Sequence, residues 1–555
     1  MPGPSSIAEL VLARADDERP GLLTAQRSWR HREVVAEAAA RAAWLAEHRG
    51  DGPFHVAVLS DNSAEFVFWL QAAALAGATV VGANPTHRGD ELVRDLVHTQ
   101  CQLLVAGASH LALLEGRGLG SALGVVQRSN PRVFVDDEAG EALAPYAGAV
   151  PPSLAASGVT PATLGYLLFT SGTSGAPKAC RCSQGRLATI GGIVASMFAL
   201  ADDDVSYLAM PLFHSNALMA GWAPSLSAGA AVALPTAGRF SASTFLPDVR
   251  RFGATYFNYV GKPLAYILAT PPHDDDRDNP LRRAFGNEGS SADVERFAAR
   301  FGCEVTDGYG SSEGGANVSR TPDTPPGALG RAPEGTCVLD PDTGTECPPA
   351  IFDGAGRLLN ASEAIGELVS KAGGAGFEGY WRNEEAERVR VRNGWYWTGD
   401  LAYRDEAGFF YFAGRDHDWI RVDGENFATA PVERIVSRYP GTVVTAAYAV
   451  PDTIVGDQVM VAIEQGAEAA PFDGEDFARF LAAQGDLGTK WAPRYVRLCP
   501  ELPKTATSKI LKRELRAERW NTPDPLWWRP DPDAAYRLLT GAERSSLEAA
   551  LAPGN

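Results

Sequence analysis

The sequence is poor in lysine. Lysine occurs only seven times in 555 residues, and aspartate and glutamate outnumber lysine and arginine by 68 to 50, which gives a formal net charge of −18. A chain this acidic is a poor candidate for wrapping nucleic acid or for binding an anionic membrane, because both partners require clustered positive charge. We therefore expect small-molecule partners and no nucleic acid. An anionic substrate would need locally placed positive charge, so each lysine is of interest.

The sequence also lacks paired cysteines. Its seven cysteines are scattered, odd in number and without a CxxC pair, which favours reduced thiols over a disulfide framework or a zinc site. Cys180 and Cys182 alternate along a predicted strand and would share one face. We expect both to be buried small residues.

No membrane-spanning or exported segment is predicted. The chain has no run of about 18 apolar residues, the length that a transmembrane helix needs. Its beginning, MPGPSSIAELVLARADDERP, lacks the basic stretch followed by an apolar stretch that is typical of a secretory leader. We therefore expect a cytoplasmic protein.

The sequence does contain a large apolar fraction in an ordered alternation. Hydrophobic residues make up 45% of the chain, and its length suggests about two to four domains. Apolar runs such as FHVAVLSDN (54–62) alternate with helical patterns such as AEFVFWLQAAALAGA (64–78) and a long helix over roughly 184–200. This alternation predicts an α/β fold in which helices cover mostly parallel sheets.

The composition changes near residue 416. Strand patterns such as VVTAAYAVPD (443–452) are followed by a helical pattern at DFARFLAAQG (476–485), which is typical of a small α+β domain. We predict a large N-terminal domain over 1–415, a small mobile C-terminal domain over 416–520 and a tail over 521–555. Trp527 and Trp528 are expected to pack this tail onto the body of the protein.

One loop carries the residues of an anion site. FTSGTSGAPK (169–178) follows an apolar run. Gly172 and Gly175 allow a tight turn and a close approach to a ligand, exposed backbone N–H groups bind anions, and Lys178 adds a positive charge. Its hydroxyl donors are Thr170, Ser171, Thr173 and Ser174. A polyphosphate is the natural guest of such a loop, although the spacing alone also fits a plain surface loop.

Three further motifs follow in order. They are DGYGSSEGG (307–315), GWYWTGDLAYRDEAGFFYFAGR (394–415) and PKTATSKILKREL (503–515). Together with the loop they resemble the motifs of the adenylate-forming (ANL) superfamily, which includes acyl-CoA synthetases, adenylation domains of nonribosomal peptide synthesis and luciferases. Residues 286–315 and RVDGENFATAPVERI (421–435) further resemble the fatty-acid-transport-protein-like branch and the actinobacterial fatty-acyl-CoA ligases.

The resemblance implies catalytic and nucleotide-binding residues. Lys509 would bridge the carboxylate of the acid and the α-phosphate of ATP, Glu313 would orient a magnesium ion, and Thr170 would act at the start of the phosphate loop. The implied nucleotide-binding residues are Ser171, Gly172, Thr173, Ser174, Gly175 and Lys178 for the β- and γ-phosphates, Asn287, Glu288, Gly289 and Tyr309 for the adenine, Gly310, Ser311 and Ser312 in the glutamate motif, and Asp400 and Arg415 for the ribose.

Other motif positions concern the acid, CoA and the hinge. His214, in PLFHSNALMAGW, resembles the gate to the acyl pocket of the family, and Trp222 in the same segment would line that pocket. Either residue would alternatively fill the core. The positions implied for CoA or a second substrate are Gly424, Glu425 and Asn426. The pivot of the small domain would be His417 or Asp418, which departs from the usual residues of the family.

The resemblance implies an AMP-forming ligase that uses ATP, Mg²⁺ and CoA. The leading hypothesis is adenylation of a carboxylic acid followed by transfer to CoA. The alternative is an ATP-dependent diazotase, which adenylates nitrite, transfers it to an aromatic amine and needs no CoA. A non-catalytic nucleotide-binding protein is a third hypothesis, against which the intact Lys509, Glu313 and Asp400 argue. The sequence leaves the chain length of the acid and the oligomeric state open.

Overall fold

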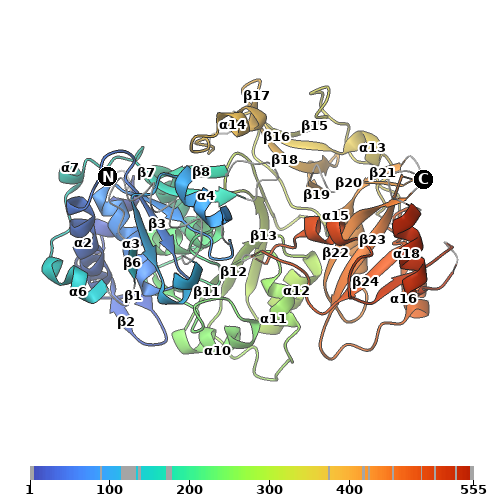
Figure 1. Cartoon of the computed structure of the whole chain (residues 1–555), viewed down its shortest axis with the longest axis horizontal. Coiled ribbons are helices and arrows are strands. Elements are labelled where there is room, and N and C mark those ends of the chain that lie inside the picture. The colour runs from blue at the N-terminus through green and yellow to red at the C-terminus, as the bar shows by residue number, and fades with distance from the viewer. Residues whose placement is uncertain are drawn as a thin grey trace.

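The computed structural model of the chain describes most of its length. The described residues are 5–87, 90–113, 133–135, 139–170, 178–354, 356–372, 376–415, 419–422, 425–452, 456–488, 490–505, 508–531 and 534–550. The chain progresses along an elongated molecule, from a large lobe that begins at the N-terminus to a smaller lobe at the other end (Figure 1). None of the helices in these ranges combines the length and apolar character that crossing a bilayer requires.

The first sheet has six strands in the order β6-β5-β3-β4-β7-β8. Its strands are β3 (His55–Leu59), β4 (Thr79–Gly82), β5 (Leu103–Ala106), β6 (Val133–Val135), β7 (Leu164–Thr170) and β8 (Lys178–Ser183). All neighbours are parallel except β7 and β8, which are antiparallel. Every residue of β3 is buried, as expected for a strand between parallel neighbours with helices on the faces of the sheet.

The second sheet has eight strands in the order β14-β13-β12-β11-β9-β10-β1-β2. They are β1 (Pro20–Leu23), β2 (Ser28–Arg30), β9 (Val205–Tyr207), β10 (Ala231–Ala233), β11 (Tyr256–Val260), β12 (Arg283–Asn287), β13 (Glu304–Gly310) and β14 (Asn317–Ser319). Only the edge strands β2 and β14 are antiparallel to their neighbours. Because β11, β12 and β13 are parallel, their carboxyl ends meet at one edge, where sheets of this kind bind ligands.

Helices and short turns connect and cover these two sheets. They are α1 (Ile7–Leu12), α2 (His31–Glu47), α3 (Ala64–Ala76), α4 (Asp90–His98), η1 (Ala108–Leu113), α6 (Ala139–Leu143), η3 (Ala144–Tyr146), α7 (Leu154–Ser157), α8 (Gln184–Met197), η4 (Ala217–Trp222), α9 (Ala223–Ala228), α10 (Ala242–Phe252), α11 (Pro263–Leu268) and α12 (Ser291–Phe301). The ends of α3 follow from its sequence: the Ser63 hydroxyl accepts from Phe66 N, and Gly77 ends the helix at φ 70°.

A third sheet completes the large lobe. It contains β15 (Thr336–Leu339), β16 (Gly366–Ser370), β17 (Val391–Arg392), β18 (Trp395–Arg404) and β19 (Phe410–Arg415), with helices α13 (Ala361–Ala364) and α14 (Glu384–Arg390). All its pairings are antiparallel. The long strand β18 carries the TGD sequence of the third motif, which includes the predicted ribose ligand Asp400.

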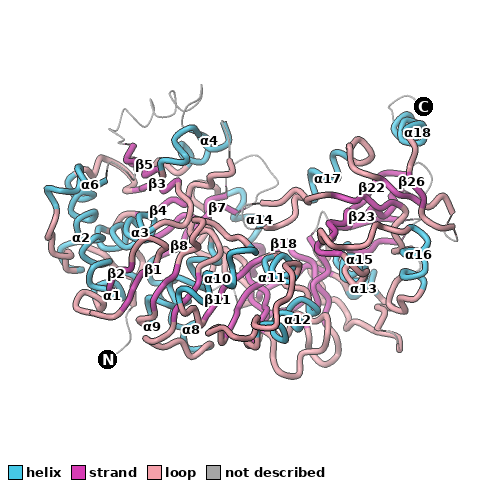
Figure 2. Tube along the Cα trace, turned by 90° about the horizontal axis from the view of Figure 1, so that it is seen from below, coloured by secondary structure: helices cyan, strands magenta, loops and turns pink. Residues whose placement is uncertain are grey.

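The smaller lobe is built around one sheet (Figure 2). Its strands are β20 (Trp419–Val422), β21 (Glu425–Ala428), β22 (Thr442–Asp452), β23 (Gly456–Gln465), β24 (Tyr495–Cys499), β25 (Leu526–Trp528) and β26 (Arg537–Leu538). Its helices are α15 (Thr429–Val436), α16 (Gly474–Ala482), α17 (Lys512–Glu518) and α18 (Gly541–Ala550). Trp527 and Trp528 lie opposite Val496 and Tyr495 of β24, so the C-terminal tail extends the sheet of this lobe.

The predicted fold class is confirmed. The large lobe contains mostly parallel sheets with helices, and the small lobe is α+β. The helix predicted over roughly 184–200 is α8, and the predicted strands at 54–62 and 443–452 are β3 and β22.

The cysteines lie in protected positions. All seven are free, and all are buried except Cys347, which is half-buried. Cys180 and Cys182 share the inner face of β8 and are both 0% exposed, as predicted. Burial raises the pKa of every one of these thiols.

Candidate active site

Most of the predicted site residues that the structure describes gather in one cleft. This cleft has a volume of about 2540 Å³ and lies between the large lobe and the 504–516 segment of the small lobe. The predicted residues that line it are Thr170, Lys178, His214, Asn287, Glu288, Gly289, Tyr309, Gly310, Ser311, Ser312, Glu313, Asp400 and Lys509. They come from all four predicted motifs, so the fold brings these distant segments together.

The predicted phosphate loop begins and ends at the cleft. Thr170 is the last residue of β7 and pairs with Lys178, the first residue of β8. The residues between them, including Ser171, Gly172, Thr173, Ser174 and Gly175, lie outside the described residues. Burial lowers the pKa of Lys178, and the nearby Arg390 guanidinium lowers it further, while Glu313 opposes both effects. The lysine therefore lies among charged groups at the mouth of the predicted loop.

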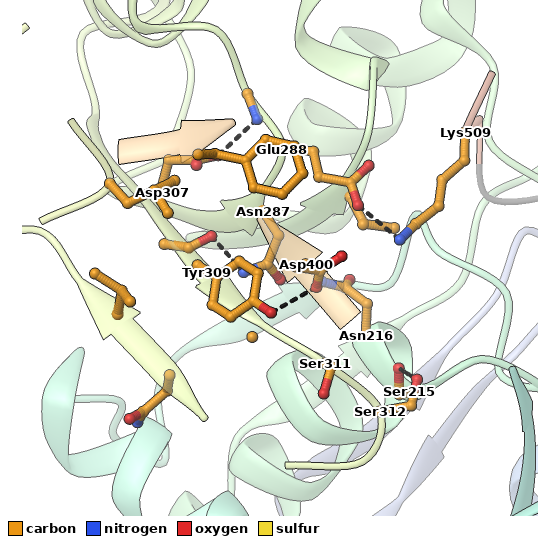
Figure 3. A pocket seen from close by; sticks show the side chains of 18 of the residues that line it. Ser215, Asn216, Asn287, Glu288, Asp307, Tyr309, Ser311, Ser312, Asp400 and Lys509 are labelled. Atoms are coloured by element: carbon orange, nitrogen blue, oxygen red, sulfur yellow. Dashed lines mark hydrogen bonds and ion pairs between the residues drawn. The ribbon is translucent and has the colours of Figure 1, made fainter. Parts of the chain in front are cut away.

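The turn after β13 is held by side chains from the large lobe. Ser312 Oγ lies 2.7 Å from Ser215 Oγ, and Arg186 Nη2 donates to the Ser312 carbonyl oxygen at 2.7 Å (Figure 3). Glu313, the next residue, is only 7% exposed. Its Oε1 accepts a hydrogen bond from Tyr380 Oη at 2.9 Å. The carboxylate predicted to orient magnesium is thus fixed by a rigid turn and a phenol.

The residues predicted to hold the ribose lie opposite each other. Asp400 on β18 pairs in register with Arg415, the last residue of β19. Tyr309 Oη donates to Asp400 Oδ2 at 2.5 Å, which connects the predicted adenine platform to the predicted ribose ligand (Figure 3). Just before Asp400, Gly399 adopts φ 71°, and its N–H donates to Glu367 Oε1 at 2.6 Å. A left-handed glycine therefore aims the carboxylate into the cleft.

The predicted adenine segment continues from the end of β12. Asn287 Nδ2 donates to the Gly308 carbonyl oxygen at 2.7 Å, and Gly289 N donates to Asp307 Oδ2 at 2.8 Å. Between them Glu288 adopts φ 66°, an unusual conformation for a residue with a side chain. Contacts on both sides of Glu288 hold this strained backbone in place.

Asp307 is a buried carboxyl group beneath this segment. Its Oδ2 accepts from Gly289 N and from Tyr259 Oη, the latter at 2.9 Å. Burial raises the pKa of Asp307 from 3.8 to about 7, and the two hydrogen bonds only partly oppose this rise.

We predict that Asp307→Asn changes how stability depends on pH. The folded-state pKa of Asp307 is above its unfolded value, so ionisation costs the folded wild-type protein free energy as pH rises from about 4 to about 7. Asparagine does not ionise, so the variant should gain about 1–2 kcal/mol relative to wild type between pH 5 and pH 7.5. Melting curves at both pH values measure this difference. Glu295→Gln on α12, an exposed site, is the control, and a pH-independent difference would contradict the prediction.

The small lobe contributes Lys509 to the cleft. Its Nζ forms an ion pair with Glu288 Oε1 at 2.6 Å, across the two lobes (Figure 3). His214 is half-buried and lies near this pair. Burial and, to a smaller extent, the nearby Lys509 lower the pKa of His214 to about 4 against the opposing effect of Glu288, so the imidazole is neutral near pH 7. The predicted catalytic lysine and the predicted gate to the acid pocket therefore share one corner of the cleft.

One face of α8 lines an apolar arm of the cleft. Ile190, Ile193, Val194 and Met197 of α8 line it at the i, i+3, i+4, i+7 spacing of one helix face. Met219 of η4 lines it too. Trp222, also predicted for this pocket, lies instead in the hydrophobic core at 1% exposure.

The residues predicted for the hinge and for CoA lie in, or directly beside, segments outside the described residues. His417, Asp418 and Gly424 lie outside the described residues. Glu425 and Asn426 begin β21, which pairs with β20. The assignment of these positions to the hinge and to CoA stays a prediction.

Several residues in or next to the cleft were not predicted, among them Ser215, Asp307, Tyr380 and Arg390. Asp307 is the first residue of the second motif and directly precedes GYG, but its burial has no local signal. Tyr380 and Arg390 had no signal either, because both precede the third motif: Arg390 reaches the cleft as the last residue of α14, and Tyr380, which lies before that helix, contacts Glu313.

The chain is similar to known proteins over most of its length. The family model described as AMP-binding enzyme matches residues 12–381. Steroid-22-oyl-CoA synthetase from Rhodococcus jostii (strain RHA1) is 51% identical over 546 residues, which cover 98% of this chain and 97% of that protein. The medium/long-chain-fatty-acid–CoA ligase FadD17 from Mycobacterium tuberculosis (strain ATCC 25618 / H37Rv) is 45% identical over 523 residues, which cover 94% and 98%.

Solved structures agree on the fold. ATP-bound MatB from Rhodopseudomonas palustris has a TM-score of 0.77 at 24% identity, covering 92% of this chain and 98% of that one. The anthranilate CoA ligase AuaEII in complex with anthranoyl-AMP has a TM-score of 0.79 at 22% identity, covering 93% and 98%. The motifs, their assembly in one cleft and these relatives lead to one conclusion: the chain belongs to the AMP-binding enzymes of the adenylate-forming superfamily, and it is an AMP-forming acid–CoA ligase.

Proposed function

We propose that this ligase activates a bulky, apolar carboxylic acid whose hydrophobic body lies in the arm between α8 and η4. The observation that carries this proposal is the apolar face of α8 that lines the cleft. Ile193 and Met197 on that face are 56% and 54% exposed, so the arm continues to the surface. An open arm accepts a long or polycyclic body, whereas a closed pocket would limit its length.

The names of the relatives support this substrate class. One relative is a steroid-22-oyl-CoA synthetase and another is a medium/long-chain-fatty-acid–CoA ligase. Both names describe acids with large hydrophobic bodies, and both proteins match nearly the whole of this chain. We infer that the acid of this enzyme belongs to the same range, either a polycyclic carboxylate or a fatty acid of medium or greater length.

The described residues fit a nucleotide with a magnesium ion. Asp400 provides a carboxylate for the ribose hydroxyls, and Tyr309 beside it provides an aromatic face for the base. Within the described ranges no three metal-ligating side chains of the His, Cys, Asp and Glu types group together. Glu313 offers a carboxylate near Lys178, which suits Mg²⁺, since this ion commonly binds through one or two carboxylates and the phosphates of its nucleotide.

In the proposed reaction, a carboxylate oxygen of the acid attacks the α-phosphorus of ATP and the bond to pyrophosphate breaks. Two anions must approach each other, so positive charge at the meeting point lowers the barrier. Lys509 provides this charge, and the neutral His214 beside it excludes water without adding repulsion to the lysine. In the second step the CoA thiol attacks the acyl carbonyl and AMP leaves.

The proposed substrate class can be tested with a variant in which a larger side chain narrows the arm. Met219→Trp should lower kcat/KM for a polycyclic or long-chain acid by about tenfold or more, with little change for a four-carbon acid, because only the larger acid occupies the arm. Thioester formation with ATP, Mg²⁺ and CoA is the measurement. Ala142→Trp, an exposed site on α6, is the control.

Two outcomes would contradict the proposal. Equal losses for large and small acids would show that the arm does not hold the acid. AMP release that requires nitrite and an aromatic amine, with no thioester from any acid, would establish the diazotase alternative.

A further inference from the structure

Arg390 reaches the cleft at the end of a short, well-anchored helix. The Asn383 side chain caps α14 by accepting from Ala386 N, and the Glu387 carboxylate accepts from Tyr380 N at 2.7 Å. These contacts tie the helix to the segment before it. Arg390, in the last turn, is half-buried and lines the cleft.

The guanidinium of Arg390 is held by the turn that presents Asp400. Its Nη1 donates to the carbonyl oxygen of Thr398, and a Cβ atom on Gly399 would collide with the same nitrogen. One edge of the guanidinium is therefore fixed against β18. Because the acceptor is a backbone carbonyl oxygen, the guanidinium is held in place relative to Asp400, the predicted ribose ligand, by the backbone of β18.

The other surroundings of Arg390 connect it to the predicted magnesium ligand. Tyr380 Oη donates to Glu313 Oε1 at 2.9 Å, and the Arg390 guanidinium interacts with the same phenol. Arg390, Tyr380 and Glu313 thus form a continuous chain. The phenol is neutral, so it does not cancel the charge of the arginine.

Arg390 and Lys178 bring two positive charges to the cleft. Arg390 and Lys178 are close enough for the guanidinium to lower the pKa of the lysine, and both interact with Glu313. Glu367 also acts on Arg390, but its carboxylate accepts from Gly399 N at 2.6 Å and pairs with Arg392 at 2.9 Å. Two cations near one shared carboxylate, in a protein with a net charge of −18, are stabilised by a bound anion.

We propose that Arg390 is a second cationic ligand of the triphosphate of ATP, facing it together with Lys178, and that it binds the pyrophosphate product in the same way. This proposal rests on the proposed function, because it takes the nucleotide site from it. Arginine suits the role, since its planar fork donates two parallel hydrogen bonds to phosphate oxygens. The nucleoside part of ATP lies at Asp400 and Tyr309, so Arg390 acts on the phosphates that AMP lacks.

The experiment compares two neighbouring arginines. Titration calorimetry without acid or CoA measures the affinity of a non-hydrolysable ATP analogue with Mg²⁺, of pyrophosphate and of AMP. Arg390→Gln should weaken the ATP analogue and pyrophosphate about 10- to 100-fold and AMP less than about threefold. Arg392→Gln is the matched control: its guanidinium pairs with Glu367 and stacks over the Trp397 ring at 3.7 Å, so all three affinities should be unchanged.

Arg390→Lys is a second variant, which keeps the positive charge but lacks the planar pair of donors of arginine. It tests the proposal even if Arg390→Gln does not fold. It should retain wild-type affinity for AMP and lose about tenfold or less for the ATP analogue. Equal losses for AMP and the ATP analogue in either variant would overturn the proposal and show that Arg390 only supports the turn at Asp400. Unchanged ATP and pyrophosphate affinity in Arg390→Gln would overturn it as well. Thioester assays with wild-type protein test the proposed function separately, so the two failures are distinguishable.

Discussion

Replacing Lys509 with alanine is expected to lower the rate of acid-dependent ATP–pyrophosphate exchange by about 10²-fold or more, which is typical of losing a charge contact in a transition state. The lysine reaches the cleft from the small lobe and lies 2.6 Å from Glu288 beside the predicted adenine segment. The motif assigns this lysine to the reacting groups, and its ammonium group acts on His214, the predicted gate to the acid pocket. The affinity for ATP should therefore change only by a few-fold, as measured by calorimetry.

Lys512→Ala is the control for this prediction. Lys512 lies three residues further along the same segment, but its Nζ pairs with Glu433 at 2.7 Å and with the Thr429 hydroxyl at 2.8 Å, inside the small lobe. Its loss should leave exchange close to the wild-type rate. If Lys509→Ala bound ATP poorly and still exchanged pyrophosphate, the lysine would be a nucleotide ligand and its catalytic assignment would be wrong.

The second large effect is expected at Asp400. Asp400→Ala should weaken ATP and AMP alike, by roughly 10²-fold, because both nucleotides carry the ribose hydroxyls that the carboxylate would accept and each charge-assisted bond contributes about 1.5–3 kcal/mol. The variant also removes the acceptor of the Tyr309 hydroxyl. Equilibrium titration with both nucleotides measures the effect.

A matched aspartate on the same hairpin separates binding from folding. Asp405 follows β18, and its carboxylate accepts from Phe409 N at 2.9 Å and Tyr411 Oη at 3.1 Å. Asp405→Ala should lower the free energy of unfolding. At a temperature where the variant is folded, its affinities for ATP and for AMP should equal those of the wild-type protein. If the affinity for AMP were unchanged in Asp400→Ala, the assignment of Asp400 as the ligand of the ribose would be wrong.

Local patterns were sufficient to predict individual elements but not their arrangement. The strand at 54–62 and the helix at 64–78 were predictable, because apolar periodicity and turn residues are local properties. The pairing of β1 with β10 joins residues 20–23 to residues 231–233, and no local pattern specifies such a partner. The same limit applies to β25, which lies within the predicted tail and yet pairs with β24 in the sheet of the small lobe.

The site shows the same division between local and long-range information. The contact between Tyr309 and Asp400 agrees with the motif assignments, since both residues were predicted to bind one nucleoside. The ion pair of Glu288 with Lys509 was not predicted, because it depends on how the two lobes meet. Asp307 and Arg390 depend on burial and on helix packing, which a single sequence does not record.

The protected cysteines make this protein well suited to spectroscopic labelling. Thiol reagents react with the thiolate at an accessible sulfur, and here burial both shields the sulfur atoms and raises the pKa of each thiol. New cysteines on the exposed surfaces of the two lobes would therefore take up fluorophores against a low background. Energy transfer between such a pair would follow the separation of the lobes during turnover, without first removing any native side chain.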